Sequence, residues 1–317
     1  MALLAIAPNL AVAATAQQPA DSLRQLDERV LTIGHRLAVE GRALCASHQY
    51  HAGFAIHDLS QYGGAHRRAL ASTGLADGPG VLALVAGGPA AGAGLQSDDI
   101  LVAVDGTPLP RAPEGIENSF APTGRIIDAL EHAFSDGYAV LAIRRAGVAR
   151  SIEVPAVLGC ASRFQVVPSD RFNALADGRY VQVTSALVAF AADDSELAGL
   201  IAHELAHNIL RHRDRLNAAG IDRGLLQHFG RNARLTRETE READRFAVYL
   251  LARAGYDPSA LIRAWRRAAP RGGSLFAGTH PRWRERIATV RAEIEEVERL
   301  RAAGLEIRPA WAPAALN

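Results

Sequence analysis

The chain has 317 residues, of which 49% are hydrophobic and 22% charged, and 35 basic residues against 34 acidic ones leave a net charge of +1. This length predicts two domains, or one large domain with an insertion. The balanced charge argues against partners bound mainly through charge, so we expect neither nucleic acid nor an anionic membrane surface as a ligand.

The chain begins with a short apolar run that ends in small residues, MALLAIAPNLAVAATAQQPADS. An A-x-A site at residues 14–16 favours a secretory signal peptide over residues 1–16, and the alternative is a buried first helix. The run is shorter than the roughly 20 apolar residues that span a bilayer, and no comparable run follows. We therefore expect a periplasmic or secreted protein with no transmembrane helix in the mature chain, and at most a peripheral association with the cell envelope.

Three segments with different patterns follow. Residues 17–44 predict an N-terminal helix, because apolar residues recur there at spacings of three and four. Residues 45–160 contain short alternating runs separated by Gly, Pro and Asp turns, with one helical run at residues 123–134, and predict a small β-rich domain. Residues 161–317 begin with two strand-like runs and continue as long helical patterns. Together these segments predict an α+β protein.

The two cysteines lie near the ends of the β-rich segment. Cys45 and Cys160 form no C-x-x-C metal or redox motif. In an oxidising compartment such a pair is expected to form a disulfide. In a reducing compartment, both would be small buried hydrophobic residues.

The stretch AHELAHNILRHR, residues 202–213, raises the question of chemistry. Asp193 followed by Glu196 forms a capping-box pattern, which predicts the start of a helix over about residues 195–216. His203 and His207 are four residues apart, so their imidazoles share one face and can converge on a cation. Glu204 lies beside them, where it can reach a water molecule. This H-E-x-x-H pattern predicts zinc with a glutamate general base; the alternative is an amphipathic helix that carries three histidines.

A third ligand is needed, and the sequence restricts where it comes from. Leu210 and Arg213 stand where a metzincin would have Gly and His. His212 falls on the opposite side of the predicted helix, so we interpret it as a structural histidine. In the later run TETEREADRFAVYLLARAGYDP, Glu240 can complete a His₂Glu site, and Asp244 can accept a hydrogen bond from a ligand imidazole. The alternative for this Glu/Asp pair is a solvated helix face.

Part of the β-rich segment resembles a known domain. The run VAGGPAAGAGLQSDDILVAVDGTPL, residues 85–109, has the small-residue helix start, the AGL and the strand ending in DG that are typical of bacterial PDZ domains. The alternative is another small β-rich domain. The resemblance implies that HAGFAI holds the carboxylate-binding loop and its following strand, with a peptide bound along the strand edge. Its peptide-binding residues would be Gly53, Phe54, Ala55 and Ile56, with glycine allowing close backbone approach.

The later segment also resembles a family. H-E-L-A-H, then E-x-E-A-D followed by AGYDP, then THP ahead of an Arg, is similar to the HtpX and CAAX-prenyl-protease type of zinc metallopeptidase, and in particular to its soluble periplasmic members. The resemblance implies the ligands His203, His207 and Glu240 and the base Glu204. It also implies catalytic contributions from His280 and Arg286. A substrate would lie along the strand at residues 179–185.

These observations predict a mostly helical gluzincin metallopeptidase domain at residues 161–317 and a PDZ-like domain at residues 45–160. We expect one Zn²⁺ per chain, which activates a water molecule to cleave peptide bonds in exported or envelope proteins. Protein or peptide substrates are the expected partners. The alternative is a protease-derived chaperone or adaptor that binds C-terminal peptides and has latent or no proteolytic activity.

Overall fold

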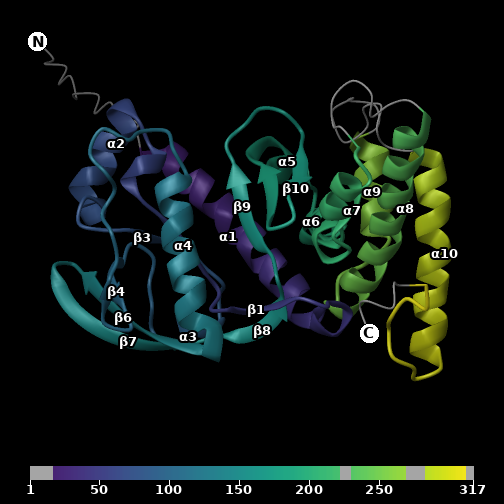
Figure 1. Cartoon of the computed structure of the whole chain (residues 1–317), viewed down its shortest axis with the longest axis horizontal. Coiled ribbons are helices and arrows are strands. Elements are labelled where there is room, and N and C mark those ends of the chain that lie inside the picture. Colours follow the sequence, from purple (N-terminus) through teal and green to yellow (C-terminus); the bar gives the residue numbers. More distant parts are fainter. Residues whose placement is uncertain (1–16, 222–229, 269–282, 312–317) are drawn as a thin grey trace, which may run out of the picture.

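The computed structural model describes residues 17–221, 230–268 and 283–311. This part consists of a β-rich unit and a mostly helical body, and α1 (Gln17–Glu40) runs between them (Figure 1). Each unit has its own hydrophobic core. The expected α+β class is therefore confirmed. The signal peptide expected over residues 1–16 lies outside the described residues.

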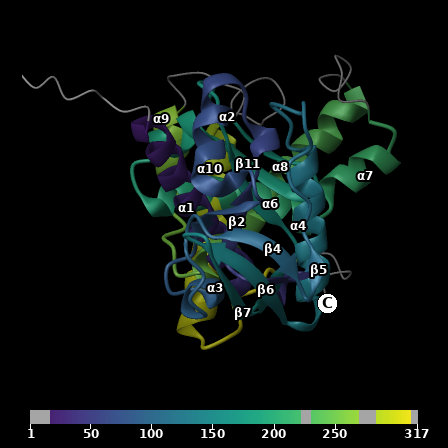
Figure 2. The same cartoon turned by 90° about the vertical axis from the view of Figure 1, so that its left-hand side faces the viewer.

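The β-rich unit is built on an antiparallel sheet with the strand order β2-β3-β4-β6-β7, seen facing the viewer in Figure 2. Its helices are the short α2 (Gly64–Leu70) and α3 (Pro89–Gly92) and the longer α4 (Ala121–Ala133), which buries Ile126 and Leu130 in the core. Strand β2 lies at an edge of the sheet. The strands are β2 (Phe54–His57), β3 (Gly80–Leu84), β4 (Ile100–Val104), β5 (Thr107–Pro108), β6 (Tyr138–Arg145) and β7 (Val148–Pro155).

A two-stranded ribbon connects this unit to the body. β1 (His48–His51) and β8 (Val157–Cys160) pair in antiparallel register, with His48 opposite Cys160. The expected disulfide joins Cys45 to Cys160, whose Cα atoms are 5.6 Å apart. Both cysteines are buried in the core of the body rather than in that of the β-rich unit. The ribbon and the disulfide therefore bring the start and the end of the inserted segment together.

The body contains a second, smaller sheet of three strands: β9 (Arg163–Val167), β10 (Ala174–Ala176) and β11 (Tyr180–Thr184). The order is β10-β11-β9, so β11 is hydrogen-bonded on both sides. The expectation that a substrate lies along residues 179–185 is therefore wrong, because the central strand has no free edge. The edge strand that packs beside the H-E-x-x-H helix is β10.

The rest of the body is helical. Its core is formed where α6 packs against α1, α8 and α9, and α10 covers α8. Within the described residues, no helix combines the length and the apolar character needed to cross a membrane. The helices are α5 (Ser185–Phe190), α6 (Asp194–Ile209), α7 (His212–Ala218), α8 (Gly230–Arg253), α9 (Ala260–Ala268) and α10 (Trp283–Ala302).

The helix expected over residues 195–216 is two helices. Asp193 caps the first turn of α6 by accepting a hydrogen bond from the Glu196 amide at 2.8 Å, so the predicted start of this helix is confirmed. The helix ends because Arg211 adopts the left-handed conformation, with φ of 53°. That conformation costs a non-glycine residue about 1–2 kcal/mol. A separate helix, α7, then begins at His212.

Candidate metal centre

Three side chains from two helices converge in the body. His203 and His207 lie one turn apart on α6, and Glu240 comes from the facing helix α8. The Nε2 atoms of the two imidazoles are 3.2 Å apart, and the Glu240 carboxylate oxygens lie 3.4 Å from His203 Nε2 and 3.5 Å from His207 Nε2. His203 and Glu240 are buried. The structure thus brings together the three residues that the sequence assigned as ligands.

The donor set is chemically suited to zinc. One ligand atom from each of the three residues lies within 4.8 Å of the others. Two imidazole nitrogens and one carboxylate oxygen form the ligand set of catalytic zinc sites, which leave a fourth position open. Among the described residues no other group of His, Cys, Asp and Glu is arranged in this way.

Asp244 holds His203 from behind. Its Oδ1 atom lies 2.8 Å from Nδ1 of His203, on the opposite side of the ring from Glu240, and the side chain is fully buried. Burial lowers the pKa of His203, but hydrogen bonds to Asp244 and Glu240 outweigh it and raise the pKa to about 10. Carboxylates that favour a proton on this imidazole would also stabilise a divalent cation at its Nε2 atom.

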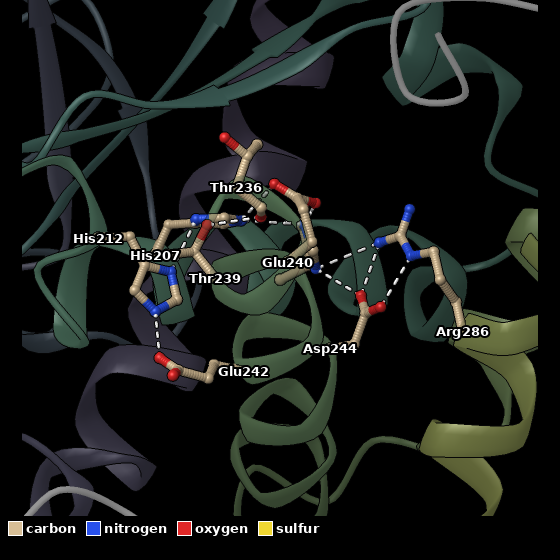
Figure 3. Close-up of polar contacts among 9 residues, drawn as sticks. His207, His212, Thr236, Thr239, Glu240, Glu242, Asp244 and Arg286 are labelled. Carbon is tan, nitrogen blue, oxygen red and sulfur yellow. Dashed lines mark hydrogen bonds and ion pairs between the residues drawn. The ribbon is translucent and has the colours of Figure 1, made fainter. Parts of the chain in front are cut away.

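Arg286 on α10 binds the carboxylate of Asp244. Its Nε and Nη2 atoms donate to the two Asp244 oxygens at 2.8 and 2.6 Å (Figure 3). Its guanidinium also lies 4.2 Å from the centre of the Trp265 ring. Burial raises the pKa of Asp244, but the positive charge of Arg286 outweighs it and lowers the pKa. The resemblance implied a catalytic contribution from Arg286, and the structure places its guanidinium on the Asp244 carboxylate. We interpret Arg286 as a residue that positions Asp244.

His207 is held by a second group of residues that the sequence analysis did not assemble. Nδ1 of His212 lies 3.0 Å from Nδ1 of His207, and Nε2 of His212 lies 3.0 Å from a Glu242 oxygen (Figure 3). Arg215 donates to the Glu242 carboxylate at 2.5 and 3.2 Å. Burial raises the pKa of Glu242, but these two partners outweigh it and hold the pKa at about 2. The sequence analysis expected His212 on the far side of one continuous helix, but α6 ends before it, and His212 begins α7 and contacts His207.

Two further residues of the expected catalytic machinery have different outcomes. Glu204 follows His203 on α6 and is buried, with 7% of its surface exposed. Arg286 lies near Glu204. Burial lowers the pKa of Arg286, but nearby carboxylates, Glu204 among them, outweigh burial and raise it. His280 lies outside the described residues.

The four residues expected to bind a peptide lie in the β-rich unit, whereas the ligands lie in the helical body. Gly53 has φ of +80°, a conformation that favours glycine, and its carbonyl accepts a hydrogen bond from Val85 at 2.8 Å. Phe54, Ala55 and Ile56 follow on the edge strand β2. All four line a cavity of about 910 Å³. Around it stand α1, α4 and β9, which contribute among others Leu31, Ile127, Arg163 and Phe164, and Phe134 adds to the lining just after α4.

Comparison with known proteins supports the chemistry of the metal centre. Residues 145–294, a little under half of the chain, match the model of peptidase family M48. The mitochondrial metalloendopeptidase OMA1 of Schizosaccharomyces pombe is 30% identical over 144 residues, which cover 38% of this chain and 43% of that protein. The putative beta-barrel assembly-enhancing protease of Vibrio cholerae is 30% identical over 135 residues, covering 33% and 28%.

The Yersinia pestis beta-barrel assembly-enhancing protease is 31% identical over 127 residues, covering 31% of this chain and 26% of that protein. The chain thus aligns with less than half the length of each of these curated relatives. The matched range contains all three ligand positions and Glu204. It supports the metallopeptidase class expected from the sequence, while the HtpX and CAAX-prenyl-protease type and the PDZ-like domain stay predictions. Residues 145–294 are thus similar to peptidase family M48, and this similarity supports metallopeptidase chemistry at the metal centre.

Proposed function

We propose that the chain is a zinc-dependent endopeptidase that cleaves exported or envelope proteins. The observation that carries the proposal is the convergence of His203, His207 and Glu240 beside the buried Glu204. When bound, zinc would supply Lewis-acid chemistry and lower the pKa of a water molecule. The remaining work falls to this chain's own residues.

Glu204 is the proposed general base. It takes a proton from the attacking water as a bond forms to the scissile carbonyl carbon, and it passes that proton to the leaving amine nitrogen. The substrate backbone would pair with the outer edge of β10, which has no neighbouring strand among the described residues and packs beside α6. An extended peptide on that edge would present its carbonyl group to the zinc-binding side of the helix.

The decisive experiment combines metal analysis with proteolysis. We expect the purified protein to contain one zinc per chain and to cleave casein or an unstructured peptide. A chelator should remove both the metal and the activity, and zinc should restore the activity. Hydrolysis that persists in metal-free protein would contradict the proposal.

We further propose that the cavity beside β2 binds C-terminal peptides. The support is the edge position of β2, the backbone conformation of Gly53 and the apolar lining by Phe54, Ile127 and Phe134. A peptide with a free carboxylate should bind more tightly than its amidated form. If such peptides bind but the zinc-loaded protein cleaves no substrate, the result would favour the alternative function of a chaperone or adaptor. Equal affinity for the two peptides would contradict the carboxylate-loop assignment.

A periplasmic or secreted location is also proposed. It is supported by the Cys45–Cys160 disulfide, since such bonds persist in oxidising compartments. Mass mapping without reductant, on protein recovered from its native compartment, tests the location through the oxidation state of the two cysteines.

A further inference from the structure

The two histidines of the metal centre are supported in different ways. Nδ1 of His203 meets a carboxylate directly, at 2.8 Å from Asp244. Nδ1 of His207 instead meets another imidazole, at 3.0 Å from Nδ1 of His212. His212 is 1% exposed, and its ring lies at 82° to that of His207 with the centroids 4.8 Å apart. Two imidazole nitrogens at this distance form a hydrogen bond only if one donates and the other accepts.

The polarity of that hydrogen bond follows from the far end of the group. The Arg215 guanidinium can only donate, so the Glu242 carboxylate accepts from it. The same carboxylate lies 3.0 Å from Nε2 of His212, and an ionised carboxylate can only accept, so His212 donates through Nε2. In a neutral imidazole the other nitrogen is then an acceptor. His207 must therefore donate through Nδ1, which leaves the lone pair of its Nε2 atom directed at Glu240 and the metal position.

We propose that His212 is a positioning residue that fixes the tautomer and the ring orientation of His207, with Glu242 and Arg215 setting its polarity. This inference rests on the proposed zinc site. The hydrogen-bond partner behind a ligand imidazole fixes its tautomer, and removing that partner typically costs about 10–100-fold in metal affinity. The left-handed residue Arg211 separates α6 from α7, and α7, which begins at His212, packs against α8.

The test uses variants of the full-length protein and two measurements that need no hydrolysis. One is the zinc dissociation constant from competition with a chromogenic chelator. The other is the ring nitrogen spectrum of ¹⁵N-histidine-labelled protein, which reports the tautomer of His207. We expect His212→Ala to weaken zinc binding about 10–100-fold and to convert His207 from a single Nδ1–H tautomer to a mixture.

Conservative and control variants separate positioning from packing. In His212→Asn, the side-chain oxygen stands where Nδ1 stood and can accept from His207, so zinc affinity should stay within a few-fold of the unmodified protein. Glu242→Gln, which leaves His212 in place, should weaken binding by less than His212→Ala does. The control is His132→Ala, which removes a histidine on the exposed side of α4 and should have no effect.

The outcomes divide cleanly. Zinc affinity and a His207 tautomer that are unchanged in His212→Ala and in Glu242→Gln would overturn the proposal. Equal losses in His212→Asn and His212→Ala would also overturn it, because the accepting atom would then be irrelevant. Should His212→Ala fail to fold, the Asn and Gln variants carry the test. Failure of the proposed function would be visible separately, as zinc-loaded protein that cleaves no substrate.

Discussion

The Asp244 carboxylate lies between two buried groups, accepting from Arg286 at 2.6 and 2.8 Å and meeting Nδ1 of His203 at 2.8 Å. Arg286 is 3% exposed and Asp244 is fully buried, so neither charge is compensated by solvent. Removing one partner of a buried ion pair typically costs about 3–5 kcal/mol, whereas replacing both by apolar residues is often neutral. The pair therefore affects stability and metal affinity in ways that can be separated.

We expect Arg286→Met to destabilise the protein by about 3–5 kcal/mol, because it leaves the Asp244 carboxylate buried without its cation. The double variant Asp244→Leu/Arg286→Met should recover most of that stability but not the zinc affinity, since His203 then lacks its acceptor. Urea unfolding and zinc competition measure the two effects. A double variant that bound zinc as tightly as the unmodified protein would contradict the assigned role of Asp244.

A second prediction concerns the general base. Glu204→Gln should abolish peptide hydrolysis and leave one zinc bound per chain, because the base contacts water and is not one of the three ligands. The matched control is Glu240→Gln, which replaces a ligand and should lower zinc content as well as activity. Substantial chelator-sensitive activity in Glu204→Gln would assign the base elsewhere.

The parts of the site that follow a local periodicity were predictable from the sequence. His203 and His207 share a face because α-helical spacing places residues four apart on the same side, and the same rule places Glu240 and Asp244 together on α8. Neither inference required knowledge of the fold. The facing of α6 and α8 was inferred from the chemistry, because the two histidines needed a third ligand.

The parts that depend on a single backbone conformation or on strand order were not predictable. Arg211 gives no sequence signal for a left-handed residue, since glycine or asparagine usually marks such a position. The contacts of His212 with His207 and Glu242 could therefore not be predicted from the sequence. Likewise, a run of alternating residues cannot reveal whether β11 is a central or an edge strand, because its neighbours β9 and β10 are set by tertiary pairing.

A third prediction is a pH dependence that arises at the contact between α1 and β9. The Asp27 carboxylate accepts from the Val166 amide at 3.3 Å. Burial raises its pKa to about 6, against the effect of that hydrogen bond and with a smaller contribution from Glu28. The folded protein then binds a proton more tightly than the unfolded chain does. The ionisation of Asp27 therefore lowers the free energy of unfolding as the pH rises from about 4 through 6, by up to about 3 kcal/mol.

Asp27→Asn should remove this dependence, because asparagine is neutral and its oxygen can still accept from Val166. We expect the variant and the unmodified protein to have similar free energies of unfolding at pH 4. The variant should become the more stable of the two by about 2–3 kcal/mol at pH 7. Urea titrations at several pH values measure the difference, which cancels the titration of all other groups. A difference that does not grow with pH would contradict the assignment.

The last prediction concerns the disulfide. Cys45 and Cys160 close a loop with a sequence separation of 115 residues, at the point where the β1–β8 ribbon leaves the body. In the chain-entropy model, such a loop stabilises the fold by about 4–5 kcal/mol.

Cys45→Ser/Cys160→Ser should lower the free energy of unfolding by up to that amount. Both cysteines are buried in the core of the body and neither belongs to the ligand group, so zinc should stay bound. Metal content and thermal unfolding, measured with and without reductant, test both parts. Zinc release on reduction alone would show that the ribbon supports the metal centre as well as the attachment of the β-rich unit.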